Sequence, residues 1–219
     1  MIIDLNLFGK RAVVVGAGRE AARKVESLLA EDCEVVVIAE SVVDVIQRWA
    51  DEQKVTLRLA HLTNGECLRE FDRVILVMAV TNNLQLNRSI VATAKEMGCY
   101  AYSVDDPLCS DFSHPATINI YDIIQIAVST GGRSPMVSGK IRELIEPALK
   151  KIIKKEDALQ VKLQEKMRMA AKQKLSTSQE RKQFLSAVYS DGEIRRLLSE
   201  EKLAEAEVLA LKIIEQFIK

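Results

Sequence analysis

Apolar runs alternate with helical periodicities through the first half of the chain. Between these runs, apolar residues recur at every third or fourth position, which is typical of amphipathic helices. Unbroken runs of β-branched residues are typical of strands buried on both faces of a parallel sheet. The pattern therefore predicts an α/β fold with a parallel sheet. The predicted strands are Val13–Val15, Val35–Ala39, 55–59, 73–80 and Tyr100–Val104.

The alternation changes character beyond residue 112. Thr117–Ile120 and Ile124–Val128 flank a turn, which predicts two short strands. An apolar stripe then runs from Ile141 to Ile152, and we expect Pro147 to kink or divide that helix. From about residue 154 the chain reads as helical throughout. The predicted domains are a nucleotide-binding domain at 1–112, a small α+β segment at 113–150 and a C-terminal helical domain at 151–219.

A glycine-rich turn joins the first apolar run to a helix. Gly16, Gly18 and Ala21 form the pattern G-x-G-x-x-A, a variant of the dinucleotide fingerprint. Gly16 permits a backbone angle closed to other residues, and Gly18 leaves room for a pyrophosphate beside the helix amides. Glycine pairs also end strands for purely structural reasons. The surrounding βαβ unit favours a Rossmann-type nucleotide site.

The second apolar run ends in Glu40, which lies 24 residues beyond Gly16. Folds of this kind place an acid close to that position, on the adenosine ribose hydroxyls. No arginine or lysine lies between Glu40 and Gln47 to receive a ribose phosphate. We therefore expect NAD rather than NADP as the cofactor. An ordinary acid in the first turn of a helix would use the same residue.

Two later stretches are candidates for chemistry on a substrate. Asp105 follows a strand predicted to end at the ligand crevice, although Asp-Pro is also a routine turn initiator. Asp106, Asp111 and His114 follow within ten residues, but closeness in sequence does not show that they converge. The loop 129–135 combines glycines, hydroxyls and one guanidinium ahead of a helix. Such a loop can bind an anion, and a bare capped turn has the same composition.

Composition narrows the class of partner. The formal net charge is zero and 48% of residues are hydrophobic, which indicates a globular protein without a nucleic-acid partner. No apolar stretch approaches the roughly 20 residues of a membrane span, and the first residues lack a basic leader, so we expect a cytoplasmic protein without a membrane partner. The stretch from Lys150 to Leu175 contains nine basic and three acidic residues. This excess indicates either a solvated helix face or attraction of a polyanion.

Five motifs together resemble one known family. They are GAGREAARK at 16–24, VTNN at 80–83, SVDDP at 103–107, FSHP at 112–115 and AVSTGGRSP at 127–135. In order and spacing they resemble the precorrin-2 dehydrogenase and siroheme synthase family. The resemblance covers about residues 3 to 150, and the helical tail carries little motif of its own. Glu40 and His114 depart from it, since many relatives have proline and an apolar residue there.

The resemblance implies a function and a set of site residues. Members of the family oxidise the tetrapyrrole precorrin-2 to sirohydrochlorin with NAD as the hydride acceptor, and some also insert ferrous iron or cobalt. The implied catalytic residues are Asp105 as the base and His114 as an accessory group, with no resident metal. The implied cofactor-binding residues are Gly16, Gly18, Arg19, Glu20, Ala39, Glu40, Ser41 and Thr81. The basic and amide groups suited to a polycarboxylate substrate are Thr130, Gly131, Gly132 and Arg133.

Two further expectations concern assembly and an alternative role. The segment 113–150 is too small to bury its apolar face alone, so we expect a two-fold homodimer built on it. The alternative hypothesis is that the protein is a non-catalytic dinucleotide sensor. In such a sensor, binding of the cofactor determines the orientation of a dimerisation module. A sensor needs neither a carboxylate at the crevice nor a polyanion site, and turnover of precorrin-2 distinguishes the two.

Overall fold

The computed structural model describes residues 2–218 of the protein. The chain divides between His114 and Pro115 into two compact units, each described here by itself. Within residues 2–218, no helix combines the length and the apolar content that crossing a bilayer would require.

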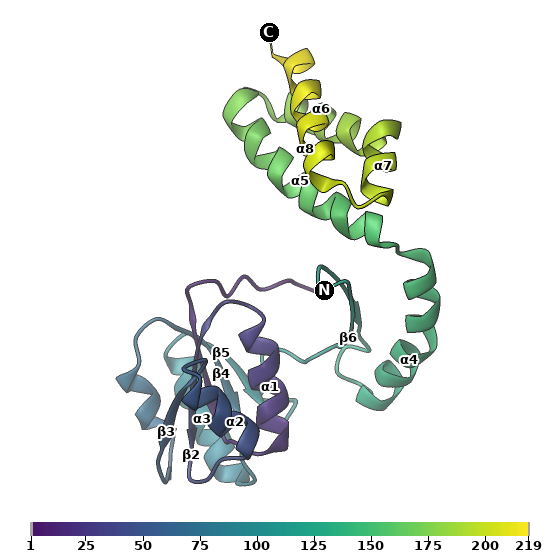
Figure 1. The fold of residues 1–219 in the computed structure, drawn as a ribbon. Helices are drawn as coiled ribbons and strands as arrows, with labels where there is room; N and C mark the ends of the chain where they lie inside the picture. Colours follow the sequence, from purple (N-terminus) through teal and green to yellow (C-terminus); the bar gives the residue numbers. More distant parts are fainter. Residues whose placement is uncertain (1, 219) are drawn as a thin grey trace. The chain divides into compact units, whose positions relative to one another are not determined.

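The first unit is built on a parallel sheet of five strands in the order β3-β2-β1-β4-β5 (Figure 1). This order confirms the predicted α/β fold. The chain starts in the middle of the sheet, winds outward to β3 and then crosses to β4, so the order reverses between β1 and β4. The strands are β1 (Arg11–Val15), β2 (Glu34–Ala39), β3 (Thr56–Leu59), β4 (Val74–Ala79) and β5 (Tyr100–Ser103).

Helices cover both faces of this sheet. Alternate residues of a strand point to opposite faces, so Val14 and Val37 join the core beneath α1 and α2, while Val13 and Val36 join the core beneath α3. A short 3-10 helix, η1, follows the Asn64-Gly65 turn and was not predicted, because five residues are too few to show a periodicity. The bounds are α1 (Arg19–Leu29), α2 (Asp44–Asp51), η1 (Glu66–Glu70) and α3 (Leu84–Glu96).

The second unit opens with an antiparallel hairpin and continues as helices. The hairpin strands are β6 (Ala116–Ile120) and β7 (Ile124–Val128), as predicted. Buried apolar side chains, with Leu163, Phe184 and Ile194 among the largest, form a separate core between the last four helices. The helices are α4 (Pro135–Ile152), α5 (Lys155–Lys174), α6 (Ser178–Ser190), α7 (Gly192–Ser199) and α8 (Leu203–Ile214), with the short η2 (Glu215–Phe217) after them.

Helix α4 begins where the sequence predicts and continues further than expected. The Ser134 side chain accepts a hydrogen bond from the Val137 amide at 3.3 Å, and Pro135 occupies the first turn. The helix runs through Pro147 to Ile152 as one element, so of the two expected outcomes, a kink or a division, the division is wrong. A proline removes one amide donor from the ladder, and the turns on either side hold the helix together here.

The two glycines of the first turn are constrained differently. Gly16 has φ of +111°, and a Cβ on it would lie 2.2 Å from the carbonyl oxygen of Val80 at the end of β4. Gly18 adopts an extended backbone, and a Cβ there would meet nothing within 4 Å. The fold therefore requires glycine at position 16 and does not require it at position 18.

This difference predicts opposite outcomes for two alanine substitutions. Gly16→Ala should lower the free energy of unfolding by about 3 kcal/mol, because both the backbone angle and the β1–β4 contact become strained. Gly18→Ala should change it by less than about 1 kcal/mol. Urea titration of both variants followed by circular dichroism measures the difference, and equal losses at the two positions would contradict it.

Candidate functional site

A cleft of 660 Å³ lies in the first unit at the carboxyl ends of β1, β2 and β4. In open parallel sheets, ligands bind at the crevice where the strand order reverses, which here is the space between β1 and β4. The predicted residues Gly16, Gly18, Ala39, Glu40, Ser41 and Thr81 all line this cleft.

The turn after β1 gives the cleft its anion-binding edge. The Gly16 amide donates to the carbonyl of Ile38 at 2.8 Å, which ties the turn to the end of β2. Gly18 is the N-cap of α1 and supplies no side-chain acceptor, so the first amides of the helix stay open toward an incoming ligand. Free amides and the positive end of a helix dipole suit a pyrophosphate. The absence of a side chain at Gly18, which the fold does not require, also leaves space for a pyrophosphate.

Two predicted cofactor residues lie outside the cleft. Arg19 and Glu20 occupy the exposed first turn of α1, and Glu20 accepts a hydrogen bond from Arg23 at 2.8 Å. Neither residue contributes to the lining. The resemblance placed them on the phosphate side because they follow the glycines. Their role at the phosphate stays a prediction.

One lining residue was not expected from the sequence. His61 Nδ1 lies 2.5 Å from Glu40 Oε1, and both side chains line the cleft. From the sequence, His61 is an ordinary solvated loop residue. Strands β2 and β3 are parallel neighbours, however, so the residues after them meet at the same edge. The strand order is the signal that brings His61 to the acid proposed for the ribose.

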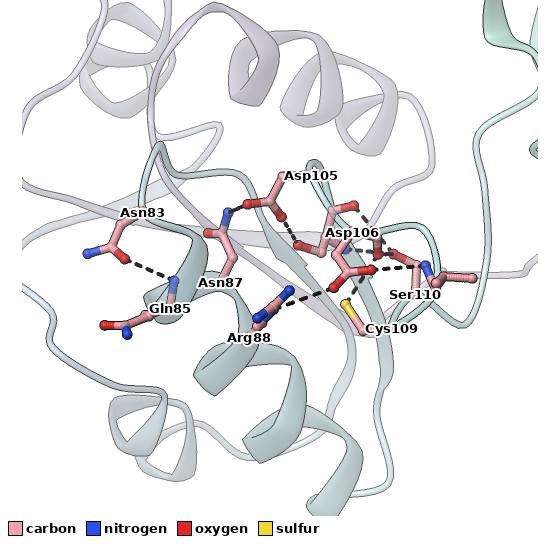
Figure 2. Close-up of polar contacts among 10 residues, drawn as sticks. Asn83, Gln85, Asn87, Arg88, Asp105, Asp106, Cys109 and Ser110 are labelled. Atoms are coloured by element: carbon pink, nitrogen blue, oxygen red, sulfur yellow. Dashed lines mark hydrogen bonds and ion pairs between the residues drawn. The ribbon is translucent and has the colours of Figure 1, made fainter.

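A buried asparagine joins the cleft to Asp105. Asn87 of α3 is fully buried, and its amide donates to the Thr81 carbonyl and to Asp105 Oδ2, both at 3.0 Å. Its carbonyl oxygen accepts from the Thr81 hydroxyl at 2.6 Å. Figure 2 shows Asn87 reaching from its helix toward Asp105. The network fixes the ends of β4 and β5 relative to each other, and no sequence pattern singled out Asn87 for this role.

The hydrogen bonds of Asp105 determine its charge state. Its Oδ1 accepts from the hydroxyl of buried Ser103, and its Oδ2 accepts from Asn87. Burial alone would raise the pKa of Asp105, but the hydrogen bonds from Ser103 and Asn87 outweigh it and hold the pKa below the ordinary value. The residue is exposed. At neutral pH, Asp105 is therefore an oriented, solvent-accessible carboxylate.

The acids that follow Asp105 do not converge with it. Asp106 lies 3.5 Å from the Arg88 guanidinium, as Figure 2 shows. Asp111 accepts from the Ala101 amide at 2.9 Å and pairs with Lys95 at 3.1 Å. In the described part of the chain, no three histidine, cysteine, aspartate or glutamate residues gather closely enough to hold a metal ion.

His114 lies in an aromatic cluster instead of among the acids. Its ring makes edge contacts with Tyr102 at 5.0 Å and Phe112 at 5.4 Å between centroids, and Lys24 of α1 sits 5.0 Å over the Tyr102 ring. Although the residue keeps an exposed side, desolvation by this packing and the charge of Lys24 lower the pKa of His114 to about 4. The ring is therefore neutral at pH 7.

The glycine loop predicted for the substrate lies in the second unit. Thr130 Oγ1 accepts from the Ser134 amide at 3.0 Å, and Gly131 and Gly132 both have positive φ. These contacts shape the turn that precedes α4. The Arg133 side chain is exposed, with no hydrogen bond or ion pair to another residue among 2–218. The loop thus presents one free guanidinium on a fixed turn.

Comparison with known proteins identifies both segments. Residues 3–116 match the family described as "Putative NAD(P)-binding", and residues 124–148 match "Sirohaem biosynthesis protein central". A siroheme synthase of Gluconacetobacter diazotrophicus is 34% identical over 147 residues, which cover 67% of this chain and 31% of the relative. One from Neisseria meningitidis is 31% identical over 214 residues, which cover 98% and 42%.

The chain spans less than half the length of these relatives. A solved structure of "SirC, precorrin-2 dehydrogenase" covers 99% of both chains with a TM-score of 0.67 and 21% sequence identity, which shows that the fold is shared. The two matched segments occur in the order that the motifs predict. The chain therefore belongs to the NAD(P)-binding family that its residues 3–116 match, and residues 124–148 carry the central segment of sirohaem biosynthesis proteins.

Proposed function

We propose that the protein oxidises precorrin-2 to sirohydrochlorin with NAD as the hydride acceptor. The observation that carries this proposal is the link from the dinucleotide cleft through Thr81 and Asn87 to the fixed carboxylate of Asp105. The names of the similar siroheme synthases and of the structural neighbour supply the substrate class. A cytoplasmic location and the lack of nucleic-acid and membrane partners stay predictions from composition.

The oxidation removes a hydride and a proton from the reduced macrocycle. Bound NAD supplies the hydride acceptor. The proton needs a base at the open edge of the sheet, and Asp105 stands there as an ionised carboxylate whose oxygens keep lone pairs beyond those engaged by Ser103 and Asn87. Because its pKa is low, Asp105 is a weak base. Its contribution therefore depends on position and on stabilising positive charge that develops on the substrate.

The ribose end of the cleft favours NAD. Glu40 presents a carboxylate that can accept from a ribose diol and repels a ribose phosphate. His61, at 2.5 Å, holds this carboxylate on the cleft wall. No lysine or arginine is among the residues that line the cleft.

The polyanionic substrate needs cations and amide donors outside the cleft. The loop from Thr130 to Arg133 supplies two positive-φ glycines and an unpaired guanidinium. Its role in binding the substrate carboxylates rests on the family resemblance.

Helix α4 supports the predicted homodimer. Within the single chain, Ser138 is its one buried residue among those described. Leu144 and Ile152 are each more than 70% exposed and Ile141 is 39% exposed, so much of the apolar stripe of α4 lacks a cover. A second copy of the same surface buries this stripe in a two-fold arrangement.

The cofactor assignment predicts a specific loss of discrimination. Wild type should bind NAD at least about tenfold more tightly than NADP, and Glu40→Ala should bring the two dissociation constants within about threefold because the repulsion and the ribose contact are both lost. Glu26→Ala, which removes an exposed acid of α1, is the matched control. Gly18→Val should abolish binding of both cofactors without unfolding the protein. Equal affinities in wild type, measured by titration calorimetry, would refute the assignment.

The catalytic assignment predicts a large effect at Asp105 and a small one at His114. Asp105→Ala should lower dehydrogenation by about 10² to 10⁴-fold at unchanged NAD affinity, whereas Asp106→Ala and His114→Ala should stay within a few-fold. NADH and sirohydrochlorin absorbance, followed without oxygen, reports turnover. Because hydrogen bonds hold the pKa of Asp105 below its ordinary value and desolvation lowers the pKa of His114 to about 4, neither should produce a step in kcat/KM between pH 5.5 and 8. A wild-type rate in Asp105→Ala removes it from the mechanism.

The assembly proposal predicts a charge-sensitive interface. Wild type should scatter light as a dimer, and Leu144→Glu should return the monomer mass of 24.5 kDa, because a buried unpaired carboxylate opposes association. Leu108→Glu, at a leucine of the first unit that is 98% exposed, should leave the dimer intact. A monomeric wild type at micromolar concentration would contradict the proposal.

A further inference from the structure

A groove lies between α5 and α6 in the second unit. Its volume is 790 Å³, which lies within the range of small-molecule sites. The two helices are antiparallel neighbours joined by a short turn at residues 175–177, and each contributes one face to the groove. The lining residues with functional groups of interest are Gln160, Arg168, Lys172, Arg181, Lys182 and Tyr189.

Of the six cations of α5, three are paired with acids, two line the groove, and Lys162 does neither within the described residues. Lys155, Lys166 and Lys174 are paired with Glu201, Glu207 and Glu215, on the side that faces α8 and the segments next to it. Arg168 and Lys172 face the groove and have no acidic partner within the described residues.

Helix α6 adds to the unpaired charge at the same end. Lys182 has no partner among residues 2–218, and Arg181 donates to the carbonyls of Leu175 and Ser176. The acids of the lining are Asp157, which caps the start of α5, and Glu165. The end of the groove near the α5–α6 turn is therefore positive.

A buried polar side chain also lines the groove. Gln160 is only 8% exposed, and its Nε2 atom has no hydrogen-bond partner. A buried donor without a partner lowers the stability of the fold by about 1 to 3 kcal/mol. No contact of Gln160 Nε2 within the described residues offsets this cost. An acceptor from a ligand in the groove would satisfy it.

Apolar surface separates this donor from the cations. Val161 and Leu185 line the middle of the groove, and the Tyr189 ring is 60% exposed beside it. An inorganic anion would use the cations and leave the apolar wall and Gln160 without contact. The lining instead matches a larger molecule that has an apolar body and several acceptor groups at its rim.

We propose that the α5–α6 groove is a binding site for a polycarboxylate with an apolar framework, separate from the dinucleotide cleft. The choice of a tetrapyrrole polycarboxylate as its ligand rests on the proposed function. The cations near the α5–α6 turn hold carboxylates, and at the opposite end, where Asp157 also lies, Gln160 donates to an acceptor group of the ligand. Val161, Leu185 and Tyr189 pack against the framework between them.

The test uses uroporphyrin, a stable tetrapyrrole that carries carboxylates around its rim, with the full chain and without NAD. Fluorescence titration should show binding that weakens with added salt. Arg168→Gln should weaken it by about tenfold, the loss expected of one charge-assisted hydrogen bond. Lys162→Gln removes an equal charge from α5 at a position outside the groove, and it should weaken binding less than about twofold.

Gln160→Met separates binding from folding. The substitution removes an unpaired buried amide at similar volume, so the thermal midpoint should rise or stay unchanged while uroporphyrin binding weakens several-fold. If Arg168→Gln and Gln160→Met both leave uroporphyrin binding unchanged, the groove is not the binding site. The absence of any binding to wild type also overturns the proposal. Competition by inorganic phosphate at the concentration of the porphyrin overturns the ligand class. Turnover of precorrin-2 is measured apart from this titration, so a failed oxidation counts against the proposed function alone.

Discussion

The contact between Gly16 and the end of β4 is the constraint on which the first unit depends. A Cβ at Gly16 would lie 2.2 Å from the Val80 carbonyl oxygen, so β1 and β4 can leave the sheet side by side only if that side chain is absent. The same approach sets where α1 begins and where Thr81 stands. The Thr81 hydroxyl donates a hydrogen bond to Asn87, and the Asn87 amide donates one to Asp105. One steric requirement therefore fixes both the cofactor edge and the carboxylate.

The sequence was most informative where a local pattern determines structure. Apolar runs predicted all five parallel strands, because burial on both faces of a sheet is determined by residues within a few positions of each other. The dinucleotide turn was predictable for the same reason. Gly16 is needed for the backbone angle of the turn, and Gly18 leaves space for the pyrophosphate.

Contacts between distant segments were not predictable in this way. The Glu40–His61 pair depends on β3 lying beside β2, and the Asn87–Asp105 contact depends on where α3 packs. The acids after Asp105 are close in sequence, but the chain turns Asp106 toward Arg88 and Asp111 toward Lys95. Helix α4 continues through Pro147, where one amide donor is missing from the ladder. These outcomes are decided by tertiary packing, which a single sequence does not display.

The pairing of charges along α5 has a consequence for the electric field of the second unit. Where lysines meet glutamates, on the side of α8, opposite charges cancel within a few ångströms and little potential leaves the surface. Where Arg168 and Lys172 stand unpaired, the potential extends into the solvent, over a screening length of about 8 Å at physiological ionic strength. The two unpaired cations that line the groove therefore add positive potential there, which the three lysine–glutamate pairs do not. An anion near the unit is drawn toward the groove by these cations before any contact is made.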